Sequence, residues 1–455
     1  MEFQHVNPAT GETGPGYPNL DEGALEAVLT EAQAASRAWR ATTYAERAAI
    51  LRRTAVLLRE RKAPYARLMA VEMGKPLAEG EGEIEKCALV CEYYAERGAA
   101  MLADEPVETE AARSYVHYAP LGVVLAIMPW NFPFWQLLRF GAPALMAGNG
   151  ILLKHAPNVP GCALAIEQVL HDAGVPPALV RNLFISIPQT TAVIESPYVQ
   201  AITLTGSTRA GRAVAAAAGR ALKKTVLELG GSDPYVVLAD ADVAAAADAC
   251  VTGRLINGGQ SCVAAKRWIV VDAVRPAFES AVLERMARFT VGDPLHAGVQ
   301  VGPLAREDLR DELAAQVQRS IEAGARVLLG GETPSKPGAW YPVTLLADVT
   351  PGMPAFDEEL FGPVGVIIAA RDEDDALRLA NQSEYGLGAA VFTADAARGE
   401  LLAAKALEAG CCFVNAFVRS DPRLPFGGTK ASGYGRELGR HGIHEFVSAK
   451  TIYVA

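Results

Sequence analysis

Apolar residues in the first hundred positions recur at helical spacing. Residues 21–40 and 44–73 are rich in alanine, leucine, glutamate and arginine, with apolar positions about every 3.6 residues. Gly74 and Pro76 end the second of these stretches, and residues 79–98 continue the pattern. The N-terminal part of the chain is therefore predicted to be mainly helical.

Short apolar strands alternate with helices in the next part of the chain. Residues 114–118 alternate like an exposed strand, whereas 123–128 form a continuous apolar run that is typical of a buried parallel strand. Further strands are predicted at 151–154, 181–186, 200–204 and 225–229, and helices at 162–173 and 210–222. This alternation predicts a doubly wound α/β domain.

A second α/β set follows. Strands are predicted at 235–238, 268–271, 327–329, 364–369 and 412–415, and helices at 240–255 and 306–323. Neither an internal repeat nor a low-complexity linker interrupts the sequence. A chain of 455 residues fits two or three domains of roughly 100–200 residues each.

Composition and charge narrow the class of protein. The net charge is -10 and lysine and arginine form no block, which argues against a nucleic-acid partner. The apolar run 121–130 is far shorter than the ~20 residues that span a bilayer, so no membrane segment is expected. The first residues lack a basic segment followed by an apolar one, so we expect no secretory signal and a cytoplasmic protein.

The cysteines indicate neither disulfides nor a metal site. Their number, seven, is odd and the chain is long, which is unlike a disulfide framework. Cys87 and Cys91 have helical spacing, but no second ligand pair accompanies them. We therefore expect no bound metal.

Generic nucleotide motifs are weak in this sequence. The segment from Gly433 to Gly439 resembles a dinucleotide fingerprint only superficially, because its last spacing is wrong. Gly206 and Ser207 follow a predicted strand and precede a helix, where backbone N–H groups can hold a pyrophosphate. An ordinary helix N-cap explains the same residues.

Three residues are candidates for catalysis. Cys262 ends a glycine-rich turn, where a thiol is either reactive or buried and inert. Glu228 ends an apolar strand, where a carboxylate serves as a general base or as a plain loop acid. Asn131 lies between Pro129 and Pro133 at another strand end and is an oxyanion donor or a turn residue.

Six segments in one order resemble the aldehyde dehydrogenase superfamily. They are Pro129 to Pro133, Thr205-Gly206-Ser207, Glu228-Leu-Gly-Gly, Gly259-Gln260-Ser261-Cys262, Glu359-Leu-Phe361-Gly-Pro363 and Pro425-Phe-Gly-Gly428. The resemblance implies an α/β fold with two Rossmann-like doubly wound domains and a β oligomerisation arm. It places the cofactor-binding domain in 1–102 and 122–229, the catalytic domain in 230–425, and the arm in 103–121 and 440–455. A homodimer or homotetramer is implied.

The resemblance also implies a mechanism. Cys262 is the nucleophile that attacks the aldehyde, and the Asn131 side chain holds the oxyanion together with the Cys262 backbone N–H. Hydride transfer to a nicotinamide leaves a thioester, which a water activated by Glu228 hydrolyses. Removal of one oxyanion donor typically costs ~10²–10³ in kcat.

Cofactor contacts follow from the same matching. Lys154 and Glu359 are expected at the ribose hydroxyls, and Gly206 and Ser207 at the pyrophosphate. Trp130 and Phe361 are expected to shape the nicotinamide pocket. NAD-specific members often carry glutamate three residues after the lysine, whereas this chain has Pro157. A 2′-phosphate would meet no like charge there, so the cofactor is expected to be NAD or NADP.

The substrate is indicated by a branch of the family. The surroundings of Lys154 and Glu228 resemble short succinate-semialdehyde dehydrogenases, which implies that Arg139, Gln136 and Ser420 hold the substrate carboxylate. Longer enzymes of this activity carry an arginine where Ile256 stands.

Three alternatives stay open. One is oxidation of another short-chain or aromatic aldehyde. A second is a CoA-acylating dehydrogenase, against which Glu228 argues. The third is a non-catalytic cofactor-binding protein, against which the presence of Cys262, Glu228 and Asn131 together argues.

Overall fold

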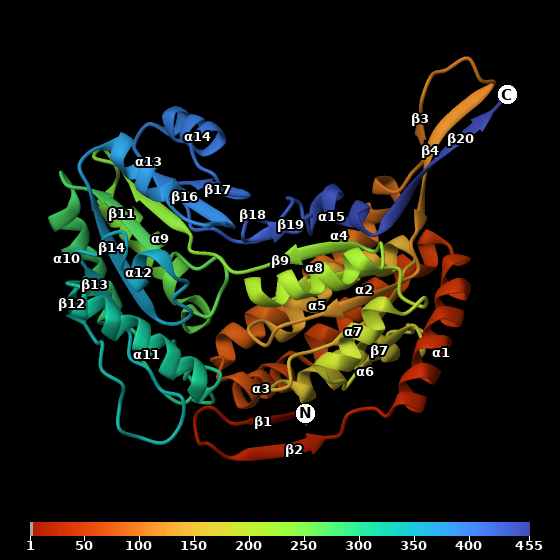
Figure 1. Ribbon diagram of the computed structural model, residues 1–455, viewed down its shortest axis with the longest axis horizontal. Coiled ribbons are helices and arrows are strands. Elements are labelled where there is room, and N and C mark those ends of the chain that lie inside the picture. Colours follow the sequence, from red (N-terminus) through yellow and green to blue (C-terminus); the bar gives the residue numbers. More distant parts are fainter. Residues whose placement is uncertain (1–2) are drawn as a thin grey trace.

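The computed structural model describes residues 3–455 and shows two lobes, each built on one large sheet, with an arm that projects from one lobe (Figure 1). The first lobe holds a six-stranded sheet in the order β19-β9-β8-β5-β6-β7. Its strands are β5 (Val123–Ile127), β6 (Gly150–Lys154), β7 (Val180–Asn182), β8 (Ala201–Thr205), β9 (Lys224–Glu228) and β19 (Gly433–Tyr434). All neighbours pair in parallel except β19, which is antiparallel to β9.

Helices cover both faces of this sheet because alternate residues of its strands point to opposite sides. Val124 and Ala126 of β5 belong to a core with α4 (Leu77–Met101), α5 (Pro133–Ala147) and α6 (Pro160–Asp172). Val123 and Leu125 belong to a separate core with α1 (Glu22–Arg40), α7 (Ile187–Glu195) and α8 (Thr208–Arg220). The predicted doubly wound arrangement is confirmed.

The second lobe holds a seven-stranded sheet in the order β12-β13-β14-β11-β10-β16-β17. Its strands are β10 (Pro234–Val237), β11 (Arg267–Val271), β12 (Arg326–Leu329), β13 (Thr344–Ala347), β14 (Val364–Ala370), β16 (Gly388–Phe392) and β17 (Cys411–Val414). Only β12 runs antiparallel to its neighbour. The helices of this lobe are α9 (Val243–Leu255), α10 (Arg275–Met286), α11 (Glu307–Glu322), α12 (Pro354–Asp357), α13 (Glu373–Asn381) and α14 (Ala396–Lys405).

The arm is a three-stranded antiparallel sheet of β3 (Glu105–Pro106), β4 (Arg113–Pro120) and β20 (Val447–Val454). It extends away from both lobes and ends near the C-terminus (Figure 1). Tyr453 and Val454 near its tip are exposed. The preceding helix α15 (Gly439–Glu445) lies against α5 rather than in the arm.

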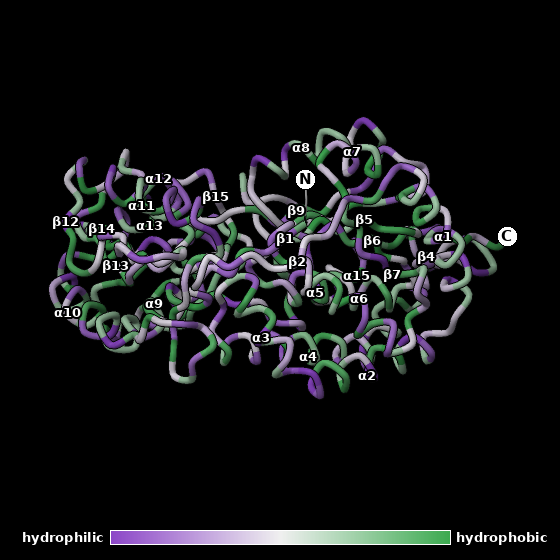
Figure 2. Tube along the Cα trace, turned by 90° about the horizontal axis from the view of Figure 1, so that it is seen from below, coloured by the Kyte–Doolittle hydropathy of each residue, from purple (hydrophilic) through white to green (hydrophobic). Residues whose placement is uncertain are grey.

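The polypeptide trace is hydrophobic mainly along the inner strands, such as β5 and β6, and hydrophilic along many peripheral turns (Figure 2). Two short strand pairs lie outside the main sheets. They are β1 (Phe3–Val6) with β2 (Thr13–Tyr17), and β15 (Tyr385–Gly386) with β18 (Thr429–Lys430). No helix in residues 3–455 combines the length and the apolarity required to cross a membrane.

Some sequence-based boundaries are wrong. The stretch 44–73 forms two helices, α2 (Tyr44–Glu60) and α3 (Lys62–Met73), because Arg61 leaves helical geometry and Pro64 is tolerated only in the first turn of a new helix. The strand expected at 181–186 ends at Asn182. The β1–β2 hairpin, β13 and β16 were not predicted, since Gly14 and Pro15 in the hairpin and the alanines of β16 carry little strand propensity.

Candidate active site

Two cavities meet at Cys262. The larger cavity has a volume of about 500 Å³ and lies between α4, α5, α9 and the loop after β17. The smaller cavity, of about 180 Å³, lies at the carboxyl ends of β5, β8 and β9. Among the described residues, Cys262 is the one that lines both cavities. Cys262 therefore lies where the two cavities meet.

The turn before Cys262 requires left-handed backbone. Asn257, Gly258 and Gly259 have φ values of 56°, 59° and 76°, which asparagine and glycine tolerate best. A Cβ atom on Gly259 would lie 2.1 Å from the carbonyl oxygen of Gly362. The turn thus packs directly against the segment that carries Glu359 and Phe361.

Two charged side chains, a half-buried glutamate and a buried arginine, hold this turn in place. The Glu79 carboxylate accepts the Asn257 N–H at 2.9 and 3.0 Å. The Arg254 guanidinium donates to the carbonyls of Leu360 at 2.7 Å and Val364 at 2.5 Å, and also to that of Gly362. One side chain therefore ties α9 to the segment that faces the cysteine.

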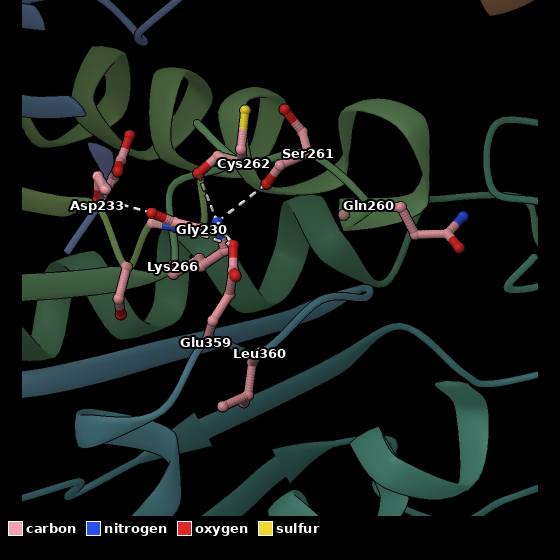
Figure 3. A network of polar contacts seen from close by, with 12 residues as sticks. Gly230, Asp233, Gln260, Ser261, Cys262, Lys266, Glu359 and Leu360 are labelled. Carbon is pink, nitrogen blue, oxygen red and sulfur yellow. Dashed lines mark hydrogen bonds and ion pairs between the residues drawn. The ribbon is translucent and has the colours of Figure 1, made fainter. Parts of the chain in front are cut away.

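Lys266 joins the backbone of the cysteine to Glu359, as Figure 3 shows. Its buried ammonium donates to the carbonyls of Ser261 at 2.9 Å and Cys262 at 2.7 Å, and lies 3.2 Å from the Glu359 carboxylate. Glu359 also accepts the Gly231 N–H at 3.1 Å. The ion pair fixes the orientation of the cysteine backbone and of the carboxylate together.

Asn131 is buried at the carboxyl end of β5 and lines the smaller cavity with Cys262. The side-chain Nδ2 of Asn131 donates to the backbone carbonyl of Gln260 at 3.1 Å. The backbone carbonyl of Asn131 accepts from the Lys75 ammonium at 2.9 Å and from the Asn257 side-chain amide at 2.7 Å. An amide nitrogen carries two donors, so one N–H of Asn131 remains for a ligand.

The Cys262 thiol is protonated at neutral pH. Burial raises its pKa to about 12, although the charges of Arg139 and Lys266 oppose this rise. The thiolate is the nucleophilic form, so attack by this sulfur requires a proton acceptor.

Glu228 is buried at the carboxyl end of β9, and neither of its carboxylate oxygens has a hydrogen-bond partner among the described residues. Burial raises its pKa well above the usual range; Arg139 opposes this and Glu437 reinforces it. Glu228 lines neither cavity, since its side chain lies against Gly427, where a Cβ atom would be 2.8 Å from Oε1. A buried carboxyl without a partner is suited to exchange a proton rather than to hold structure.

Arg139, Gln136 and Ser420 lie in the larger cavity with Cys262. The Arg139 guanidinium forms a buried ion pair with Glu437, donates to the Thr205 hydroxyl at 3.3 Å and lies 4.7 Å from the Phe426 ring centroid. The structure therefore brings the three residues together, but the charge of Arg139 is already balanced.

Most residues expected at a cofactor line the smaller cavity. They are Trp130, Gly206, Ser207, Glu359 and Phe361. The rings of Trp130 and Phe361 meet edge-on with centroids 5.8 Å apart, and Ser207 is the N-cap of α8. Lys154 and Pro157 are not among its lining residues, because they belong to β6 and the loop after it, on the far side of β5 from β8. Burial lowers the pKa of Lys154.

Sequence reasoning missed Lys86, Lys266 and Glu437. Lys86 lines the larger cavity, and the other two are buried beside the residues already described. No motif marks them, because their importance depends on partners that are distant in sequence. Among residues 3–455, no group of three or more histidine, cysteine, aspartate or glutamate side chains is arranged to hold a metal ion.

The high pKa of Cys262 predicts its reactivity. The rate of alkylation by iodoacetamide, followed by mass spectrometry of the Cys262 peptide, should rise about tenfold per pH unit from pH 7 to 10, because the thiolate fraction does so below the pKa. Lys266→Met should be alkylated more slowly at each pH, since a cation beside the thiolate is lost. A plateau below pH 8 would contradict the assigned pKa, and Cys262→Ala provides the unlabelled control.

Comparison with known proteins identifies the family. The model of the aldehyde dehydrogenase family matches residues 1–452. The chain is 46% identical over 455 residues to a probable NADP(+) succinate-semialdehyde dehydrogenase of Synechocystis sp., with 100% of both proteins covered. It is 47% identical to the NAD(P)+ succinate semialdehyde dehydrogenase Sad of Escherichia coli, with 98% of this chain and 97% of that protein covered.

Solved structures agree. Succinic semialdehyde dehydrogenase from Streptococcus pyogenes in complex with NADP+ superposes with a TM-score of 0.97 at 37% identity, over 99% of both chains. Succinate-semialdehyde dehydrogenase from Burkholderia pseudomallei superposes with a TM-score of 0.96 at 35% identity, over 100% of this chain and 95% of that one. The full-length family match and these superpositions share one conclusion: the chain belongs to the aldehyde dehydrogenase family.

Proposed function

We propose that this protein oxidises succinate semialdehyde to succinate with NAD or NADP. The observation that carries the proposal is the position of Cys262, which lines a cavity suited to a carboxylate-bearing aldehyde and a second cavity suited to a nicotinamide. The relatives from Synechocystis and Escherichia coli are named as succinate-semialdehyde dehydrogenases, which supports the same substrate.

The smaller cavity is suited to the nicotinamide and pyrophosphate part of a dinucleotide. It lies at the carboxyl ends of parallel strands, where doubly wound folds bind such ligands. Gly206 and Ser207 offer backbone N–H groups at the start of α8 for a pyrophosphate, and Trp130 and Phe361 supply aromatic walls for the nicotinamide. Lys154 is proposed to bind a ribose hydroxyl of the cofactor. Pro157 stands where a glutamate would repel a 2′-phosphate, so NADP is acceptable as well as NAD. When bound, the nicotinamide supplies the hydride acceptor.

Cys262 is proposed to form the covalent intermediate, and Asn131 to stabilise it. The Cys262 thiol releases its proton to solvent, and the thiolate sulfur attacks the aldehyde carbon to form a thiohemiacetal. The free N–H of Asn131 and the Cys262 backbone N–H stabilise the oxygen, which carries negative charge. Loss of hydride from this carbon leaves a thioester on Cys262.

Glu228 is proposed to hydrolyse the thioester. Its carboxylate takes a proton from water, the hydroxide oxygen attacks the thioester carbon, and Cys262 leaves as a thiolate with release of the acid. Since burial raises the pKa of Glu228, the carboxylate form becomes more populated as pH rises. Hydrolysis should therefore be faster at alkaline pH.

We further propose that different segments of the chain form the cofactor-binding domain, the catalytic domain and the oligomerisation arm. Residues 1–102 and 122–229 bind the cofactor, 230–425 supply the nucleophile, and 103–121 with 440–455 join subunits. The exposed edge of the arm sheet is suited to pair with a strand of another copy in a homodimer or homotetramer.

A second candidate substrate is an aromatic aldehyde. Phe132, Trp135, Phe289 and Phe426 line the larger cavity and offer apolar walls that a carboxylate does not use. A comparison of kcat/KM for aliphatic and aromatic aldehydes separates the two functions.

Succinate semialdehyde should give a higher kcat/KM than butanal and benzaldehyde in steady-state assays with NAD and with NADP. Its carboxylate is expected to bind in the end of the larger cavity formed by Gln136, Arg139 and Ser420. A higher kcat/KM for benzaldehyde would favour the second candidate instead.

Glu228→Gln should separate the two halves of the reaction. Acylation should still yield about one equivalent of reduced cofactor per active site, whereas steady-state turnover should fall about 10²–10⁴-fold, because a general base contributes this much. Stopped-flow absorbance at 340 nm measures both phases. The exposed glutamate in Glu284→Gln serves as the control, and a variant that loses the first turnover equally would refute this role.

Deletion of residues 447–455 should reduce the molar mass in solution to that of a monomer. This deletion removes β20, and therefore the strand that covers β4. Light scattering coupled to gel filtration measures the mass. An unchanged mass would show that subunits join through another surface, and Tyr453→Asp tests the arm tip without loss of a strand.

A further inference from the structure

Lys86 lies on the face of α4 that lines the larger cavity. Glu79, Gly82, Glu83 and Lys86 all line this cavity, at spacings of three and four residues that place them on one side of a helix. A Cβ atom on Gly82 would meet no heavy atom within 4 Å, so the space beside Lys86 is open.

The ammonium of Lys86 has two partners and a remaining donor. It donates to the Ser420 hydroxyl at 2.7 Å and lies 4.2 Å from the centroid of the Trp135 ring. An ammonium carries three N–H groups, and a serine hydroxyl that accepts a hydrogen bond still has its own O–H to donate. Lys86 and Ser420 therefore form a pair of donors within one cavity.

The charge of Lys86 is not balanced by a carboxylate, unlike that of Arg139. Glu437 pairs with Arg139, and Glu83 pairs with Lys75. Of the described cations that line the larger cavity, Lys86 and Arg419 have no carboxylate oxygen within 4.0 Å, and Arg419 is exposed. Lys86 is thus the cavity cation that is both largely shielded from water and free to pair with an anion.

Ile256 lines the same cavity. An uncharged side chain there leaves the task of binding an anion to another element, and α4 provides a cation in the same cavity.

We propose that Lys86, together with Ser420, binds the carboxylate of the substrate and makes the enzyme selective for short aldehydes that carry a terminal carboxylate. The inference rests on the proposed function and names the residue that determines its specificity. Arg139, which is paired with Glu437, lines the same cavity beside Gln136 and Ser420, and Lys86 adds a cation that no carboxylate balances.

The ionisation of Lys86 gives this role a pH dependence. Burial, together with the charge of Arg139 on α5, lowers the pKa of Lys86 to about 8, although Glu83 and Cys87 on α4 and Asp421 after Ser420 oppose the change. Lys86 is charged below this pH and neutral above it, so preference for an anionic substrate should decline as pH rises through about 8.

Two other charged groups face the cavity and need separate treatment. Burial raises the pKa of Glu79, which lines the cavity, to about 7. The negative charge that Glu79 gains above this pH also weakens the binding of an anionic substrate, but at a lower pH than the loss of charge on Lys86. Arg419 is a cation at every pH in question. The difference between wild type and a Lys86 variant isolates the contribution of Lys86.

The test compares succinate semialdehyde with its neutral methyl ester, methyl 4-oxobutanoate. The ratio of their kcat/KM values cancels the ionisations of Cys262 and Glu228, which both substrates share. In Lys86→Met this ratio should fall about 10- to 100-fold, mainly through KM for the anion, since a charge-assisted hydrogen bond is lost. The kcat for the ester should change little.

Two further variants support the comparison. Lys86→Arg keeps the charge and should retain most of the preference. Lys62→Met removes a lysine that pairs with Glu81 outside both cavities, and should behave as wild type.

The outcomes are distinct. A wild-type enzyme without preference for succinate semialdehyde over its ester refutes the proposed function itself. A preference that survives unchanged in Lys86→Met overturns only the role of Lys86. If Lys86→Met does not fold, the wild-type pH profile decides: a ratio that falls through about pH 8 supports the proposal, and one that is flat from pH 7.5 to 9.5 overturns it.

Discussion

The structure of the site depends on charged side chains, two buried and one half-buried, that bond to the backbone on either side of Cys262. Glu79 holds the N–H of the left-handed Asn257, Arg254 holds carbonyls around Gly362, and Lys266 holds the carbonyls of Ser261 and Cys262. A buried charge is tolerated only when hydrogen bonds replace its hydration, so each group also resists any change in the backbone that it bonds. The sulfur is consequently presented at the junction of two cavities by a loop that has little freedom to move.

The site exists only where the two lobes meet. Asn131, Arg139 and Glu228 come from the six-stranded sheet and its helices, whereas Cys262, Lys266 and Glu359 come from the second lobe. Burial raises the pKa of both Cys262 and Glu228, so the resting pair favours its neutral forms and avoids two unpaired negative charges in a shielded volume. Proton loss from the thiol therefore has to accompany substrate or cofactor binding, while the partnerless Glu228 carboxyl stays available for the later hydrolysis.

The affinity of the larger cavity for an anion depends on the net charge of the groups that line it, rather than on the number of cations among them. Arg139 was expected to bind the substrate carboxylate, yet its ion pair with Glu437 makes it a neutral unit. Lys86 contributes a charge that no carboxylate balances, and Ser420 adds a neutral donor beside it. The aromatic walls Trp135 and Phe426 lower the local polarity on their side of the cavity, which strengthens an ion pair formed beside them.

Local patterns were sufficient for the family and for much of the architecture. Strands such as Val123–Ile127 are continuous apolar runs, and the ordered motifs around Asn131, Glu228 and Cys262 point to one family before any coordinates are known. The break at Arg61, the pairing of Arg139 with Glu437, and the positions of Lys86 and Lys266 were decided by tertiary structure. The physical reason is that hydrophobic periodicity and turn chemistry act between neighbours in sequence, whereas the net charge and accessibility of a buried side chain depend on partners that can be hundreds of residues away, as Lys86 and Ser420 are.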